Sequence, residues 1–152
     1  MSKKPIIVFE GIEGSGKSHH ISVVSKYLTK KKISHIKIRE PGGNPNSEKI
    51  RKLILNNKSN FNQNTDLLLY MAARSENVDL IKKFYNKKII LIDRFTDSTI
   101  AYQHFGMGVD INLIKGYVSI YINKCNYQLF SDNANLIFSS RSSPLKFFPI
   151  TI

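Results

Sequence analysis

The sequence predicts an α/β fold of three layers, in which helices flank both faces of a parallel sheet. Short apolar segments, such as residues 5–9 and 88–93, alternate with longer segments whose apolar side chains recur at helical spacing. The second of these segments contains a continuous apolar run and ends in Asp93, which is typical of a strand buried on both faces. The chain of 152 residues has the length of one domain.

The other elements follow from the same two periodicities. Residues 18–31 are predicted to form a helix and residues 34–39 a strand, and the prolines and glycines of residues 40–45 predict a loop. Further along, the pattern predicts a helix that Ser47 caps, a polar turn over 56–64 and a helix over 65–84. After the strand at 88–93, it predicts helical segments over 97–105 and 110–124, with a break at 106–108. Another strand is predicted at 136–138.

A phosphate-binding motif lies between the first predicted strand and the first predicted helix. Residues 11–18 fit the pattern G-x-x-x-x-G-K-[ST] at every fixed position. Its glycines allow the backbone N–H groups to surround a phosphate, and the start of the helix adds its positive dipole end. Lys17 can then neutralise the β- and γ-phosphates of ATP, while the Ser18 hydroxyl can ligate Mg²⁺. The candidate nucleotide-binding residues are Gly11, Ile12, Glu13, Gly14, Ser15, Gly16, Lys17 and Ser18.

Polar residues also follow two other predicted strands. Arg39 and Glu40 come after one strand, and Asp93 and Arg94 end another. Because ligands bind at the carboxyl ends of strands in such sheets, these residues and the phosphate loop are expected to share one crevice. Asp93 is the candidate second magnesium residue, and the alternative is an aspartate that only caps the next turn.

The few arginines of this chain are candidates for phosphate recognition. The sequence has five arginines beside eighteen lysines, and lysine serves equally well for solubility. A planar guanidinium fork matches phosphate oxygens, so Arg39, Arg51, Arg74 and Arg94 are singled out, whereas solvated surface arginines are the alternative.

The composition argues against several other classes of protein. The net charge of +12 comes from scattered lysines, without an interleaved basic and aromatic stripe, so we do not expect a nucleic-acid partner. No apolar run is long enough to span a membrane, and the N-terminal residues lead directly into a strand, so we expect neither a membrane segment nor a signal peptide. The single cysteine, Cys125, fits a reduced cytoplasmic location.

Taken together, the motifs resemble a known enzyme family. The matching segments are residues 9–18, Arg39-Glu40-Pro41-Gly42-Gly43, Ala72-Ala73-Arg74, Asp93-Arg94-Phe95 and residues 97–103. In order and separation they are similar to thymidylate kinase of the bacterial type, over about residues 6–124. The resemblance implies a P-loop NTPase-type fold and transfer of a phosphoryl group from ATP to dTMP with Mg²⁺, giving dTDP and ADP.

The resemblance also implies roles for residues around the phosphates. Lys17 and Ser18 correspond to the residues that hold the ATP phosphates and the metal. Glu13 corresponds to an acidic loop residue near the sugar and phosphate of dTMP. Arg51 and Arg94 correspond to the arginines that hold the dTMP phosphate, so that the two phosphates meet in line. Lys17, Glu13 and Arg94 are therefore the candidate catalytic residues.

A second group corresponds to residues around the nucleoside. Tyr70 matches an aromatic residue that stacks on thymine, although core packing is the alternative, and Arg74, one helical turn later, matches a residue that binds the base. Tyr102 and Gln103 match residues around the deoxyribose and the base. The candidate substrate-binding residues are Glu40, Pro41, Arg51, Tyr70, Arg74, Arg94, Ser98, Tyr102 and Gln103.

The chain also departs from the family pattern. His19 and His20 stand where the family usually has Thr and Gln, and their spacing is unsuited to a metal pair. Family members continue into a strand, an arginine-bearing lid and a C-terminal helix, whereas residues 126–152 lose this expected pattern and have Arg141 as their only arginine. We therefore expect residues 1–125 to form a nucleoside monophosphate kinase-like domain, with residues 126–152 as an atypical tail and a C-terminally incomplete fold.

Three functions remain open at this point. The first is a dTMP kinase, the second a nucleotide-binding remnant with little turnover because the lid arginine is missing, and the third a basic nucleic-acid-binding module that uses ATP. The pairing of Tyr70 with Arg74 favours the first two. Apolar surface on the helices predicted at 65–84 and 110–124 suggests a homodimer.

Overall fold

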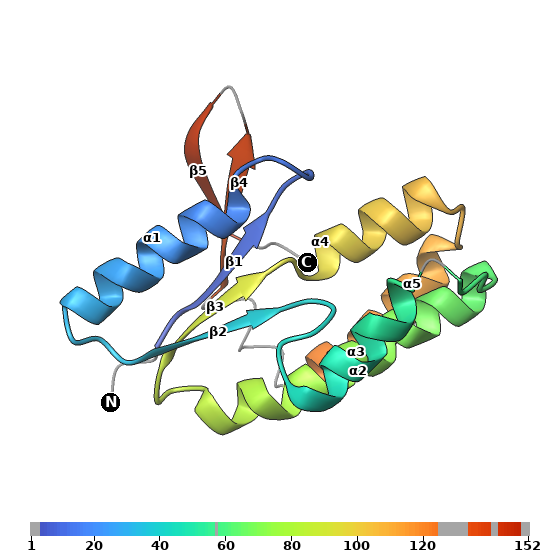
Figure 1. Cartoon of the computed structure of the whole chain (residues 1–152), viewed down its shortest axis with the longest axis horizontal. Coiled ribbons are helices and arrows are strands. Elements are labelled where there is room, and N and C mark those ends of the chain that lie inside the picture. The colour runs from blue at the N-terminus through green and yellow to red at the C-terminus, as the bar shows by residue number, and fades with distance from the viewer. Residues whose placement is uncertain (1–3, 57, 125–133, 141–142, 150–152) are drawn as a thin grey trace.

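The computed structural model describes residues 4–56, 58–124, 134–140 and 143–149. Its strands and helices alternate as the sequence predicts, and Figure 1 shows α1 on one side of the sheet and α2, α3 and α5 on the other. The elements are β1 (Ile6–Glu10), α1 (Lys17–Lys30), β2 (His35–Arg39), α2 (Pro45–Ile54), α3 (Gln63–Phe84), β3 (Ile89–Asp93), α4 (Thr96–Thr99), the π-helix η1 (Ile100–Gly106), α5 (Ile111–Lys124), β4 (Ala134–Ser140) and β5 (Ser143–Pro149).

The sheet has the strand order β2-β3-β1-β4-β5. Strands β1, β2, β3 and β4 run parallel, with Val8 opposite Ile92 and Ile38 opposite the same residue from the other side, whereas β5 is antiparallel to β4. The predicted parallel sheet is therefore confirmed, and so is the strand predicted at 136–138, which falls within β4. Cys125 and Arg141 lie outside the described residues.

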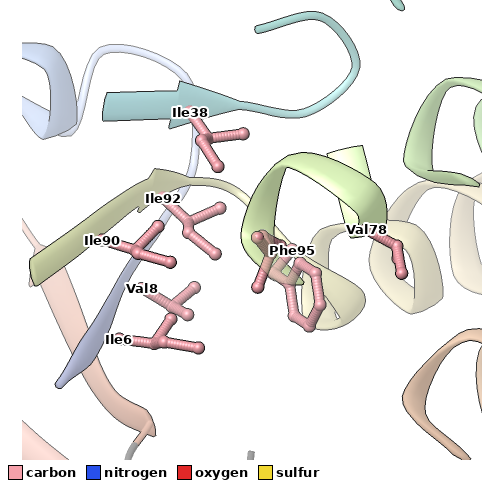
Figure 2. Close-up of a cluster of buried hydrophobic side chains, with 8 residues drawn as sticks. Ile6, Val8, Ile38, Val78, Ile90, Ile92 and Phe95 are labelled. Carbon is pink, nitrogen blue, oxygen red and sulfur yellow. The ribbon is translucent and has the colours of Figure 1, made fainter. Parts of the chain in front are cut away.

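The alternation of strand side chains divides the core between the two faces of the sheet. Ile6, Val8, Ile90 and Ile92 are fully buried, and they pack with Ile38, Val78, Ile81 and Phe95 on the α3 side. Figure 2 shows the side chains of Ile6, Val8, Ile90 and Ile92 extending from the same side of their strands. On the other face, Phe9 and Leu91 pack against Ile21 and Leu28 of α1. Because both faces are covered, the strands read as unbroken apolar runs in the sequence.

A third apolar cluster joins α3 to α5. Leu67 and Met71 of α3 pack with Val109 and with Ile114 of α5, and all four side chains are buried. The cluster covers part of the apolar surface of both helices, while Leu68, Leu113 and Ile120 remain exposed on them. Among the described residues, no helix combines the length and apolar character needed to cross a membrane.

One local prediction needs correction. The predicted cap Ser47 lies inside α2, which begins at Pro45, and the cap is Asn44, whose side chain accepts from the N–H groups of Asn46 and Ser47. Proline at the first helical position fits this earlier start.

The segment predicted to be helical at 97–105 is confirmed. It consists of the short α-helix α4 followed by the π-helix η1, a form often found at functional sites.

An ion pair connects the end of β2 with α2. Nε and Nη2 of Arg39 donate to the two carboxylate oxygens of Glu48 at 2.9 and 2.7 Å, and the N–H of Gly43 donates to Oε1 at 2.8 Å. The bond from Arg39, followed by that from Gly43, lowers the pKa of Glu48 from 4.5 to about 2. The loop after β2 is thereby tied to the first turn of α2.

We expect this pair to stabilise the fold in a pH-dependent way. Because the pKa of Glu48 is lower in the folded than in the unfolded chain, its contribution is present above about pH 4.5 and is lost as the pH falls toward 2. The two side chains are 52% and 32% exposed, so we expect only about 1 kcal/mol. Urea unfolding of wild type and Glu48→Gln should show a difference at pH 7 that shrinks toward zero on acidification. A difference that is constant with pH would contradict the pair's role.

Candidate active site

The phosphate loop connects β1 to α1 and depends on glycine backbone geometry. Gly14 and Gly16 have φ values of 73° and 86°, which other residues rarely adopt, and Gly16 is the N-cap of α1. The helix therefore begins at Lys17, as the motif requires, with its N-terminal dipole end at the loop. This local geometry makes residues 11–18 suited to binding a phosphate anion.

The ammonium of Lys17 lies over this loop. Nζ donates to the carbonyl oxygens of Gly11 and Ile12 at 2.8 and 2.7 Å, and to Oγ of Ser15 at 3.4 Å. Burial lowers the pKa of Lys17, and the positive charge of Arg94 lowers it further. An anionic group bound beside Lys17 and Arg94 would relieve the repulsion between their two positive charges. The two side chains are therefore suited to binding a phosphate.

The two predicted magnesium residues lie at one cavity. Ser18 and Asp93 both line a space of about 330 Å³ between α1, β2 and β3. Oδ1 of Asp93 is buried and has no hydrogen-bond partner among the described residues. No group of three or more His, Cys, Asp or Glu side chains in the described part of the chain is arranged to hold a metal. One carboxylate and one hydroxyl fit Mg²⁺, which takes few protein ligands and keeps phosphate and water oxygens.

A second cavity, of about 220 Å³, lies beside the phosphate loop. All nine predicted substrate-binding residues line it, although they come from four separate parts of the chain. Glu13 lines it as well, so this cavity adjoins the phosphate loop directly. The predicted residues that the cavity brings together are Glu40, Pro41, Arg51, Tyr70, Arg74, Arg94, Ser98, Tyr102 and Gln103.

Arg74 lines this cavity and forms a buried ion pair. Its Nε donates to Oε2 of Glu40 at 2.7 Å, and the two side chains are 4% and 5% exposed. Its Nη2 donates to the carbonyl oxygen of Phe95 at 3.1 Å and to Oγ1 of Thr99 at 2.9 Å. The guanidinium therefore joins α3 to the loop after β2 and to the segment after β3.

Two further arginines approach the same cavity. Nη1 of Arg51 donates to the carbonyl oxygen of Pro41 at 2.8 Å. Nη1 of Arg94 donates to Oγ of Ser98 at 3.2 Å, and its guanidinium lies 5.2 Å from the ring centroid of Tyr102. Arg94 has a φ of 66°, which is uncommon outside glycine, and such strain is often found at functional sites.

A buried carboxylate holds the segment that carries Arg94. Oε1 of Glu10, at the end of β1, accepts from the N–H groups of Phe95 and Ser98 at 2.6 and 3.3 Å, and its Oε2 accepts from Oγ of Ser98 at 2.5 Å. The N–H of Arg94 itself donates to the carbonyl oxygen of Phe9. Burial raises the pKa of Glu10, while the bonds from Ser98 and Phe95 oppose that rise. Glu10 therefore caps α4 and anchors the backbone on either side of Arg94.

Sequence reasoning did not identify three of these residues. Glu10, Thr99 and the buried Asn77 of α3 all make hydrogen bonds that support the cavity, and their partners are 25 to 88 residues away. The one available signal was for Glu10, which is a carboxylate at the end of an apolar strand next to the phosphate motif. The ring centroids of His19 and His20 are 5.8 Å apart in an edge contact.

The arrangement suits transfer between two phosphorylated ligands. One ligand would occupy the phosphate loop with Lys17, Ser18 and Asp93, and the other would occupy the arginine-lined cavity. Arg94 contributes to both, because it lines the cavity and is close enough to Lys17 to affect its pKa. Two anions brought together between fixed cations is the geometry that phosphoryl transfer requires.

Comparisons with known proteins show the family of the chain. The family model described as thymidylate kinase matches residues 9–119. The chain is 42% identical over 110 residues to the thymidylate kinase of Kosmotoga olearia, which covers 71% of this chain and 53% of that protein. It is 44% identical over 121 residues to the thymidylate kinase of Halothermothrix orenii, and this alignment covers 78% of this chain and 58% of that protein.

A solved structure is also similar. The crystal structure of thymidylate kinase from Ehrlichia chaffeensis aligns with a TM-score of 0.70 and 26% identity, covering 93% of this chain and 92% of that chain. The chain spans about half the length of the curated relatives that it matches.

We expect Glu10 to contribute strongly to stability. In Glu10→Ala, the buried N–H of Phe95 and the partly buried N–H of Ser98 lose their acceptor, at about 1–3 kcal/mol for a fully buried unsatisfied donor. The free energy of unfolding, measured with urea, should fall by at least about 1 kcal/mol. Glu13→Ala removes an exposed glutamate nearby and should change it by no more than about 0.5 kcal/mol. Equal effects of the two substitutions would contradict the anchoring role of Glu10.

Proposed function

Because the chain belongs to the thymidylate kinase family, we propose that it transfers the γ-phosphoryl group of ATP to dTMP, giving dTDP and ADP. The observation that carries this proposal is the cavity beside the phosphate loop. It is lined by two arginines suited to a phosphate, by an aromatic ring suited to a base, and by Glu13 of the loop itself. An acceptor nucleotide bound there has its phosphate next to the donor site.

The phosphate groups would be held by cations from both sides. Lys17 binds the β- and γ-phosphates of ATP, and Arg51 and Arg94 bind the phosphate of dTMP. Mg²⁺ would be held by Ser18 and Asp93, and when bound it would neutralise charge on the ATP phosphates. Charge that develops on the transferred group is then surrounded by fixed positive groups, which is the main form of catalysis in this reaction.

Unpaired polar atoms at the cavity support recognition of thymine. Nη1 of Arg74 and Oε1 of Gln103 are buried and have no hydrogen-bond partner among the described residues. Nε2 of Gln103 donates to Oδ2 of Asp66 at 3.3 Å, and because a carboxylate only accepts, the amide oxygen is left for a ligand. A donor and an acceptor match the O4 oxygen and the N3–H group of thymine. Tyr70 supplies the ring that stacks on the base.

The first test concerns the donor site. Lys17→Ala removes a charge-assisted hydrogen bond worth about 1.5–3 kcal/mol, so the affinity for ADP with Mg²⁺ should fall roughly 10- to 150-fold. Calorimetry would measure this, with circular dichroism as the check on folding. Lys26→Ala, at an exposed position of the same helix, should leave the affinity unchanged. Unaltered binding by Lys17→Ala would refute the assignment of the loop.

The second test concerns the base. The wild-type chain should bind dTMP more tightly than dCMP or dGMP, because cytosine presents a donor where Arg74 also donates, and guanine presents a different pattern of groups. A mispaired polar group costs about 1–3 kcal/mol, so the preference over dCMP should be roughly 5- to 150-fold. Calorimetric titration with the three monophosphates measures it. Equal affinities for dTMP and dGMP would rule out this acceptor site.

A further inference from the structure

A buried asparagine of α3 holds the loop that follows β2. Asn77 is completely buried, and its Nδ2 donates to the carbonyl oxygens of Arg39 and Gly42 at 3.3 and 2.8 Å. Its Oδ1 accepts from Nδ2 of Asn44 at 2.9 Å. Both ends of the amide are therefore used, and all three partners lie within residues 39–44.

The same loop is held from α2 by a second buried side chain. Oγ of Ser47 accepts from the N–H of Gly42 at 2.9 Å and donates to the carbonyl oxygen of Ala73 at 3.0 Å. The peptide groups on both sides of Gly42 are thus fixed by Ser47 and Asn77. Gly42 and Gly43 have φ values of 117° and 103°, which residues other than glycine rarely adopt. Because glycine can adopt many other backbone conformations, hydrogen bonds from outside the loop are needed to hold it in this one.

This loop supplies two groups to the arginines of the cavity. The carboxylate of Glu40 pairs with Arg74, and the carbonyl oxygen of Pro41 accepts from Arg51. A shift of the loop would move the partners of both arginines together. None of the described hydrogen bonds of Asn77 reaches residues 11–18, so Asn77 does not hold the phosphate loop directly. Arg39 and Gly43 line the cavity of Ser18 and Asp93, so the phosphate loop itself, rather than that cavity, is the part of the donor site separate from this anchor.

We propose that Asn77 is a positioning residue for the acceptor site. By fixing residues 40–43, it sets Arg51 and Arg74 in place for the phosphate and the base of a nucleoside monophosphate, whereas the phosphate loop of residues 11–18 makes none of its hydrogen bonds. The inference rests on the proposed function, and it adds a determinant of acceptor affinity that does not touch the ligand.

Asn77→Leu is the direct test, because leucine has the same number and branching of side-chain heavy atoms and is uncharged but makes none of the three hydrogen bonds. We expect the dissociation constant for dTMP to rise roughly tenfold or more and that for ADP with Mg²⁺ to change by less than about twofold. Asn64→Leu makes the same change at an exposed position of the same helix and should alter neither value. Thermal unfolding gives the temperature at which each variant begins to unfold, and all titrations are made below the lowest of these temperatures.

Ser47→Ala provides a milder second variant. It removes the acceptor of the Gly42 N–H and the donor to the carbonyl oxygen of Ala73, while the three hydrogen bonds of Asn77 remain. It should therefore weaken dTMP binding in the same selective way, and it decides the question if Asn77→Leu does not fold. An equal loss of dTMP and ADP affinity, or no loss of either, would overturn the positioning role. A wild-type chain that binds ADP but no nucleoside monophosphate would instead overturn the proposed function and, with it, this inference.

Discussion

The buried ion pair between Arg74 and Glu40 is the constraint on which the acceptor cavity depends. It joins α3 to the loop after β2, and the same guanidinium also reaches the segment after β3. Removing one member of a buried pair leaves an uncompensated charge, at about 3–5 kcal/mol. Three elements that are distant in sequence are thus fixed around the side chain of Arg74. Nη1 of the same side chain has no hydrogen-bond partner among the described residues and remains a donor at the cavity.

The fold and the phosphate loop could be predicted from the sequence because both depend on local patterns. Strands covered on both faces are unbroken apolar runs, and the loop geometry is encoded by glycines such as Gly14 and Gly16 within eight consecutive residues. The acceptor residues have no such local pattern. Tyr70 was named through the resemblance to a family, and Arg51 was singled out as one of few arginines, but nothing in their spacing alone indicates a common cavity.

The residues that sequence reasoning missed act across long separations. Glu10 caps a helix whose first N–H donor is 85 residues away, and Asn77 holds a loop more than thirty residues before it. Such pairs exist only after the sheet has formed, so no local window contains them. The error at Ser47 is different, because Asn44 and Ser47 are both good caps, and Pro45 was the signal that favours the earlier one.

The strand order has a consequence for self-association. Among the described strands, β2 is an edge strand of the sheet, and one side of its backbone has no neighbouring strand. This edge strand is only five residues long, and Lys37 and Arg39 are exposed on it. A short edge strand with positively charged side chains repels the same strand of another copy, which protects a protein against aggregation by strand addition. We therefore expect any dimer of this chain to leave β2 unpaired rather than to extend the sheet through this strand.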